Sequence, residues 1–170
     1  GEVFTLTQTE EKGRYRLQQG ALVQGLYLNE LFLRAFQPQQ PLPELFQRYR
    51  ELLYTLQAGE NLPAVMCLEL ELLAACGYSL NLWQDDHSGV ELRAEQLYRF
   101  RPEFGLVAAD DLLAEPHDTL ISGDLLLALR TPEQMPLAAW QELRRVLDRL
   151  WRILLKGKTL YARQLLSELK

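Results

Sequence analysis

The chain has 170 residues, of which 48% are hydrophobic and 24% charged; this is typical of one folded domain and excludes a disordered or collagen-like chain. No apolar run approaches the roughly 18 residues of a membrane helix, and two cysteines exclude a disulfide framework, so we expect a cytoplasmic protein. The net charge of -5 is uneven, because residues 141–170 carry eight basic and three acidic side chains. An acidic body with a basic end argues against a general nucleic-acid-binding surface and indicates an anionic partner at that end.

The first segments predict a strand and a connector. Residues 2–9 alternate β-forming side chains, and a single strand needs sheet partners, which are either missing from this sequence or supplied by another copy of the chain. The first residue is Gly rather than Met. We therefore expect a fragment or a processed chain, in which residues 1–10 carry the strand, residues 11–19 are a connector, and residues 20–170 form the main domain.

Three helices are predicted next. Residues 20–37 are apolar on nearly every side, which predicts a helix in the middle of the core. A second helix follows Pro43 and ends at Gly59, and a third begins near Pro63, a favoured first-turn residue, and ends at Gly77.

The second half of the chain begins with a change in character. Residues 78–118 form an insertion, in which two short runs at 96–101 and 104–109 predict a small hairpin or knuckle. Ser122 is a predicted N-cap for a short helix to residue 130, and helices follow at 136–155 and about 160–169. The predicted fold class is mainly α: a multi-helix bundle with a β-hairpin insertion and an N-terminal strand.

The predicted helix at 136–155 carries a row of cations. Arg145, Arg149, Arg152 and Lys156 are spaced i, i+4, i+7 and i+11, so they lie within about 60° of one another along about 16 Å. Lys158 and Arg163 extend this row across the next turn. These six residues are the candidate site for an anionic partner; the alternative is a solvated helix face.

No pattern indicates a metal site or catalysis. Cys67 and Cys76 lie about 13.5 Å apart along one helix and cannot share an ion. The run from Asp85 to His87 is more typical of a solvated loop than of a cation site. Glu69 and Glu71 point about 160° apart on their helix, so we do not expect a catalytic pair, and Glu69 is expected to bond within the core. The sequence predicts a protein that is not an enzyme and has no cofactor.

Four segments resemble the RecO family of bacterial recombination mediator proteins. Each is weak alone, and their order and spacing over residues 20–166 carry the resemblance. They are Tyr27-Leu28-Asn29-Glu30-Leu31, Leu68-Glu69-Leu70-Glu71-Leu72-Leu73 with Gly77-Tyr78, Ile121-Ser122-Gly123, and Lys156-Gly157-Lys158-Thr159-Leu160-Tyr161-Ala162-Arg163.

The resemblance implies a fold and a set of partners. Such proteins join a DNA-binding OB-fold to a helical domain, so residues 1–10 would be the last strand of an OB-fold that is otherwise missing. The implied role, in the cytoplasm at the nucleoid, is recombinational DNA repair of the RecFOR type. The helical domain would bind RecR and the acidic, Phe-ended tail of single-strand-binding protein, promoting RecA loading and strand annealing, and single-stranded DNA would bind mainly through the OB-fold.

Two departures from the family pattern affect these expectations. The Arg pair that relatives commonly carry before the third helix's Phe-Glu is replaced by Met66 and Cys67, which removes a basic anchor for the tail. The four-Cys zinc knuckle of some relatives is absent, since no Cys follows Tyr78. A different class of function stays open: an all-helical regulatory domain with a small apolar ligand in a closed cavity lined by Phe32, Phe36 and Leu72.

Overall fold

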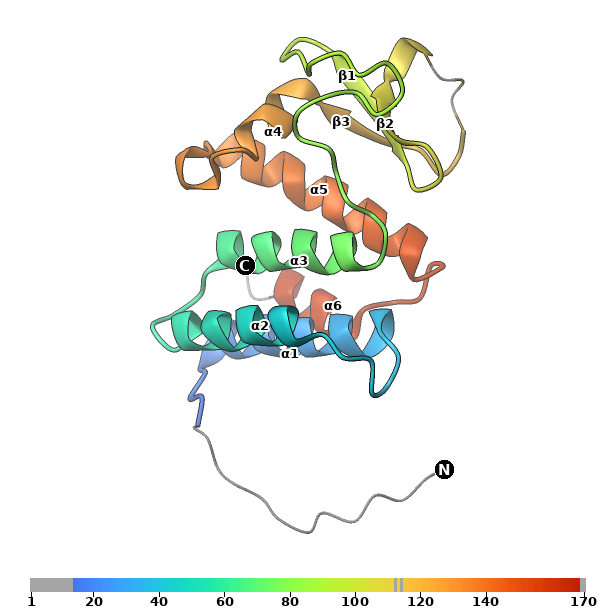
Figure 1. Cartoon of the computed structure of the whole chain (residues 1–170). Helices are drawn as coiled ribbons and strands as arrows, with labels where there is room; N and C mark the ends of the chain where they lie inside the picture. The colour runs from blue at the N-terminus through green and yellow to red at the C-terminus, as the bar shows by residue number, and fades with distance from the viewer. Residues whose placement is uncertain (1–13, 112, 114, 169–170) are drawn as a thin grey trace.

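A computed structural model describes residues 14–111, 113 and 115–168. These residues form a helical bundle with a small antiparallel sheet on one side, so the predicted fold class is confirmed (Figure 1). The predicted strand at residues 2–9, and the whole segment 1–10, lie outside the described residues. Among the described residues, every helix is too short or too polar to span a bilayer.

Helices α1 (Gln19–Ala35), α2 (Pro43–Leu56) and α3 (Leu62–Ala75) follow the sequence signals closely. Pro43 opens α2 and Pro63 lies in the first turn of α3, where a missing N–H costs no helical hydrogen bond. The Asn61 side chain caps α3 by accepting from the Ala64 N–H at 3.1 Å. Figure 1 shows α2 and α1 at one end of the bundle and α3 between them and α5.

The insertion folds as a three-stranded sheet. Strands β1 (Leu97–Arg101) and β2 (Gly105–Ala108) form the predicted hairpin, and β3 (Thr119–Ser122) pairs antiparallel with the other side of β1, giving the order β2-β1-β3. Tyr98, Phe100 and Ile121 are buried beneath the sheet and join the bundle core. A short 3₁₀ turn, Ala109–Asp111, follows β2.

The last three helices complete the bundle. Helix α4 (Gly123–Ala128) is capped by the Ser122 side chain, which accepts from the Leu125 N–H at 3.1 Å, and the 3₁₀ turn Pro132–Gln134 links it to α5 (Leu137–Leu154). Helix α5 lies between α3 and the sheet, and α6 (Tyr161–Glu168) returns to pack on α1 (Figure 1). Each of these helices agrees with its predicted range to within a few residues.

A buried carboxylate joins three helices. Glu69 of α3 is 0% exposed, and it accepts hydrogen bonds from the Tyr27 hydroxyl at 2.7 Å and the Trp151 indole N–H at 2.9 Å. Both terminal nitrogens of Arg144 donate to the same carboxylate, at 2.6 and 2.9 Å. The expected core role of Glu69 is therefore confirmed.

The charge network continues from this core to α6. Arg144 also pairs with Asp148 at 2.9 Å, and Asp148 in turn accepts two hydrogen bonds from Arg163, at 3.0 and 2.8 Å. Burial alone would lower the pKa of Arg144, but the Glu69 carboxylate raises it. The net shift of this pKa is upward. Burial, followed by the charge of Glu69, raises the pKa of Tyr27 well above its ordinary value. Tyr27 is thus a neutral donor and Arg144 a permanent cation.

The prediction of α1 as a central helix is wrong. Its buried side packs on α2, α3 and α6, but Leu22, Leu26 and Leu33 lie along an exposed stripe, and Leu33 is 82% exposed. Hydrophobicity all round the helix indicated burial all round it, whereas neighbouring helices cover only part of its surface.

Candidate functional site

The predicted row of cations lies on the exposed side of α5 and the turn that follows it. Arg145, Arg149, Arg152, Lys156 and Lys158 are all exposed. Arg163 is half-buried, and its pairing with Asp148 compensates its charge. Five of the six predicted residues therefore present a cation to solvent, and the sixth belongs mainly to the network that holds α6.

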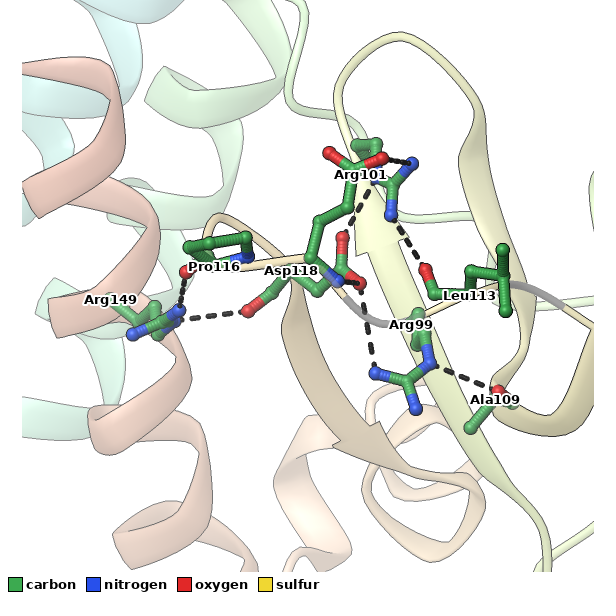
Figure 2. A network of polar contacts seen from close by, with 8 residues as sticks. Arg99, Arg101, Ala109, Leu113, Pro116, Asp118 and Arg149 are labelled. Atoms are coloured by element: carbon green, nitrogen blue, oxygen red, sulfur yellow. Dashed lines mark hydrogen bonds and ion pairs between the residues drawn. The ribbon is translucent and has the colours of Figure 1, made fainter.

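Arg149 also supports the insertion. Its guanidinium donates to the backbone carbonyls of Pro116 at 2.5 Å and Asp118 at 3.1 Å. These hydrogen bonds attach the segment that leads into β3 to α5. Figure 2 shows Asp118 between Arg149 on one side and Arg99 and Arg101 on the other. Because backbone carbonyls carry no net charge, Arg149 keeps its positive charge for a further partner.

Two arginines of β1 hold the same segment from the other side (Figure 2). Arg101 donates to the Asp118 carboxylate at 2.8 Å, to Glu115 at 2.9 Å and to the Leu113 carbonyl at 3.1 Å, and Arg99 lies 3.6 Å from Asp118. The hydrogen bond from Arg101, against the opposing effect of burial, lowers the pKa of Asp118. This carboxylate is an ion-paired structural group.

A cleft of about 710 Å³ lies between this segment, the β1–β2 turn and the C-terminal half of α5. We call it the α5 cleft. Arg149, Arg152 and Lys156 supply cations along one wall, and the apolar surface comes from Tyr78, Phe104 and Ile153. The Phe104 ring is 57% exposed and lies 5.3 Å from the Arg101 guanidinium carbon. Two acids, Glu103 and Glu115, also line the cleft, and Glu115 is paired with Arg101.

The turn after α5 holds Lys156 in an unusual backbone conformation. Lys156 has φ of 51°, in the left-handed region, and Gly157 follows with φ of 76°. The Lys156 N–H donates to the Ile153 carbonyl and the Gly157 N–H to the Arg152 carbonyl, which is the Schellman pattern of helix ends. Helix α3 ends with the same pair of bonds but has Gly77 in the left-handed position. A side chain at this position carries a conformational cost, and here it places an ammonium group at the cleft.

Two other predicted cations, Lys158 and Arg163, line a different hollow. Arg152, Lys158 and Arg163 surround a space of about 410 Å³ between α5 and α6, together with Asp148. Arg152 lines both this hollow and the α5 cleft. The predicted continuous row is thus divided at Arg152 into two differently oriented surfaces.

The positions that replace the family's Arg pair offer no basic anchor. Met66 is fully buried, and Cys67 lines a small apolar hollow of about 300 Å³ beside Glu71. Burial, together with the charges of Glu71 and Glu133, raises the pKa of the Cys67 thiol. This hollow is lined by one acid, Glu71, which pairs with Arg48 at 3.6 Å, and by no cation, so its lining offers an acidic peptide no basic anchor.

The expectation of a solvated loop at Asp85 to His87 is wrong for Asp85, whereas Asp86 and His87 are exposed. Asp85 is 3% exposed and accepts hydrogen bonds from the N–H groups of His87, Ser88 and Ala108 at 2.6 to 2.8 Å. Burial alone would raise the pKa of Asp85, but the hydrogen bonds from these backbone N–H groups lower it overall. Asp86 accepts from the Leu106 N–H at 2.7 Å, so both carboxylates fasten the loop to β2. In the described part of the chain, no group of three metal-ligating side chains is present.

The hollow expected for a small apolar ligand differs from the prediction. Phe32 and Phe36 line a space of about 600 Å³ at the turn between α1 and α2, but it is bordered by the exposed side chains of Leu33 and Phe46. Leu72 does not line it and is fully buried in the core.

Sequence reasoning missed the apolar half of the α5 cleft. Phe104 was recognised only as part of a hairpin, and Tyr78 only as part of the turn after α3. Their position opposite α5 depends on how the insertion docks. Part of that docking comes from Arg149, whose contacts with two carbonyls leave no signal in the sequence.

Comparison with known proteins agrees with this architecture. The family model described as Recombination protein O C terminal matches residues 20–165. The DNA repair protein RecO of Methylococcus capsulatus is 41% identical over 167 residues, covering 97% of this chain and 67% of that protein. The RecO proteins of Halorhodospira halophila and Azoarcus sp. are 33% and 34% identical, with 100% and 99% of this chain covered and 73% and 71% of theirs. The chain therefore belongs to the RecO family and corresponds to its C-terminal domain.

Proposed function

We propose that this chain acts in DNA repair as the helical domain of a recombination mediator. In this proposal it binds the acidic tail of single-strand-binding protein, whose last residue is Phe, and it binds RecR. Through these contacts it promotes RecA loading and the annealing of complementary strands, a non-catalytic role without a cofactor. Single-stranded DNA would be held mainly by an OB-fold in the part of the relatives that this chain does not cover. The family match and the names of the relatives support the role in repair.

The α5 cleft is the observation that carries the tail proposal. A peptide with several carboxylates and a terminal aromatic ring needs cations beside an apolar recess. The cleft combines Arg149, Arg152 and Lys156 with Phe104 and other apolar side chains in one space of about 710 Å³. Arg152 and Lys156 are exposed, and within the described residues neither forms an ion pair with a carboxylate. Their charges are available to a partner.

The site near Cys67 is the alternative place for such a tail. It lacks a cation and faces Glu71 and Glu133, so a carboxylate-rich peptide would gain no attraction there. Charge complementarity therefore favours the α5 cleft, and the tail would lie on the other side of α5 from α3.

The test is a titration of the chain with a fluorescent acidic peptide ending in Phe, at low and at moderate salt. We expect micromolar binding that is lost when the Phe is removed and that weakens with salt. Lys156→Glu and Lys158→Glu form a matched pair, since both residues are exposed and the charge change is the same, but only Lys156 lines the cleft. Lys156→Glu should weaken binding about fivefold to tenfold and Lys158→Glu about twofold or less.

Two results would contradict the proposal. Equal weakening by both substitutions would mean that the peptide senses only the general charge of this end of the chain. Absence of binding by the unmodified chain would exclude the tail as a ligand of this domain. RecR binding is then measured separately with purified RecR.

A further inference from the structure

Strand β3 has one edge that is not paired with another strand. In the register with β1, Leu97 lies opposite Ser122 and Arg99 opposite Leu120. The Gly123 N–H donates to the Gln96 carbonyl at 2.8 Å, whereas the Ser122 N–H points the other way and donates to Glu142 of α5 at 3.2 Å. Because pairing alternates along an antiparallel ladder, the N–H and C=O of Leu120 also point away from β1.

The outward-pointing groups on either side of Leu120 are occupied by α5. The Asp118 carbonyl accepts from Arg149 and the Ser122 N–H donates to Glu142. Between these two contacts, Leu120 borders a hollow of about 640 Å³ that we call the β3-edge hollow. Leu120 itself is 51% exposed. Helix α5 thus closes the edge at both ends and leaves one residue of it open.

The chemistry of the β3-edge hollow fits a polar, negatively charged occupant. Arg145 lines it, is exposed, and donates only to the Gln141 carbonyl of its own helix, at 3.3 Å, among the described contacts. Thr119 also lines it, and its buried hydroxyl has no hydrogen-bond partner in the described part of the chain. The two acids at the rim already have partners: Glu142 accepts a hydrogen bond from the Ser122 N–H, and Asp118 is paired with Arg99 and Arg101. A backbone donor and acceptor, a cation and an unused hydroxyl therefore meet in one place.

The β3-edge hollow adjoins the α5 cleft. Arg149 lines both spaces. Arg145 lies on α5 and Lys156 in the turn just after it, eleven residues later, which corresponds to about 16 Å at the helical rise per residue. An extended chain covers that distance in about five residues. One peptide can therefore reach both spaces, with its aromatic end in the cleft and an acidic residue about five positions earlier at Arg145.

We propose that the acidic stretch preceding the terminal Phe crosses the β3-edge hollow and pairs with the open edge of β3 at one residue, Leu120. In this arrangement its backbone pairs with the N–H and C=O of Leu120, and one of its carboxylates pairs with Arg145. The inference rests on the proposed function, since it assigns the path of the same peptide. Edge pairing gives affinity through the main chain, while Arg145 and the cleft select acidic and aromatic side chains.

Amide hydrogen exchange in the unmodified chain gives the direct test, with the acidic Phe-ended peptide as the probe. The Leu120 N–H should exchange rapidly when the chain is free and at least about tenfold more slowly when the peptide is bound. Residues of β1 and β2 should change little, because their amides are already paired.

Substitution at Leu120 gives the second test. Leu120→Pro removes only the outward N–H, so it breaks no bond to β1, and Pro is tolerated on strand edges. It should weaken peptide binding about fivefold to tenfold, and clearly more than Leu120→Thr, which changes the side chain but keeps the N–H. Arg145→Gln should weaken the acidic peptide but not one in which the acidic residues before the Phe are replaced by Asn.

The outcomes separate this inference from the proposed function. Wild-type affinity in Leu120→Pro, or unchanged Leu120 exchange on binding in the unmodified chain, would overturn the edge-strand path and leave the cleft intact. Absence of any peptide binding would overturn both. Protection of Leu120 that grows with protein concentration without peptide would assign the edge to a second copy of the chain and overturn the proposal. If Leu120→Pro fails to fold, the exchange measurement decides.

Discussion

Replacing Lys156 by Gly should make the chain more stable while removing a charge from the α5 cleft. Lys156 occupies the left-handed position of the α5 end, with φ of 51°, where a side chain crowds the following carbonyl. The main-chain bonds of the turn, from the N–H groups of Lys156 and Gly157, do not involve the side chain and would remain. The substitution therefore relieves a conformational cost without breaking a contact of the turn.

The expected gain is about 1 kcal/mol in the free energy of unfolding, which is the lower end of the cost of a left-handed residue with a side chain. In a chain of this size, that gain corresponds to a rise of about 2–4 °C in the melting temperature. Urea unfolding, followed by the fluorescence of the buried Trp151, measures it directly.

Two control variants isolate the cause. Lys156→Ala removes the charge but keeps a side chain, so it should bring no gain. Gly77→Ala introduces a side chain at the equivalent position of α3, with φ of 86°, where an added Cβ would contact nothing within 4 Å; it should lower stability by about 1–2 kcal/mol. A Lys156→Gly chain that is no more stable than Lys156→Ala would refute the strain argument.

Three further predictions concern the core, pH and metal. Glu69→Ala should lower the free energy of unfolding by about 3–5 kcal/mol, because it removes the buried carboxylate shared by Tyr27, Trp151 and Arg144 and leaves Arg144 with Asp148 alone. Glu71→Ala on the exposed side of α3 should change it little. Urea unfolding of both variants decides, and similar losses would contradict the assignment. Asp118 has a lowered native pKa, so its contribution to stability is complete above the unfolded value of about 3.9 and is lost as the pH falls through the native pKa. Asp118→Asn should accordingly flatten the dependence of stability on pH below about 4, and an unchanged acid slope would count against it. Dialysis against a strong chelator should leave the melting temperature unchanged; a drop that zinc reverses would reveal a metal site.

The helical elements were predictable because their signals are local. Pro43, Pro63, Ser122 and Gly77 mark helix ends through their own backbone chemistry, and each marks an end or cap in the structure. Strand β3 was missed because four residues, Thr119–Ser122, carry too short a pattern and pair with β1 from about twenty positions away. Local signals identify an element, but they do not identify its partner.

The candidate site was predictable in part. Helical spacing alone indicated a cationic face on α5, and the exposed side chains of Arg145, Arg149 and Arg152 lie on such a face. The ion pair between Arg163 and Asp148 could not be predicted from the spacing of residues, because it depends on how α6 packs against α5. The hydrogen bonds by which Asp85 and Asp86 hold their loop were not predicted, because their partners are main-chain N–H groups, which every residue but proline carries and which therefore leave no pattern.

The shared carboxylate of Glu69 also bears on how the domain opens. Helix α3 supplies the acceptor of one buried hydrogen-bond cluster, and α1 and α5 supply its donors. If any of the three helices separates, a charged or polar group is left in the core without its partner. Their slowest-exchanging amides should therefore report a single opening free energy, equal to that of global unfolding. A domain built in this way would keep its bundle intact while the sheet and the turn around Lys156 adjust to whatever is bound beside them.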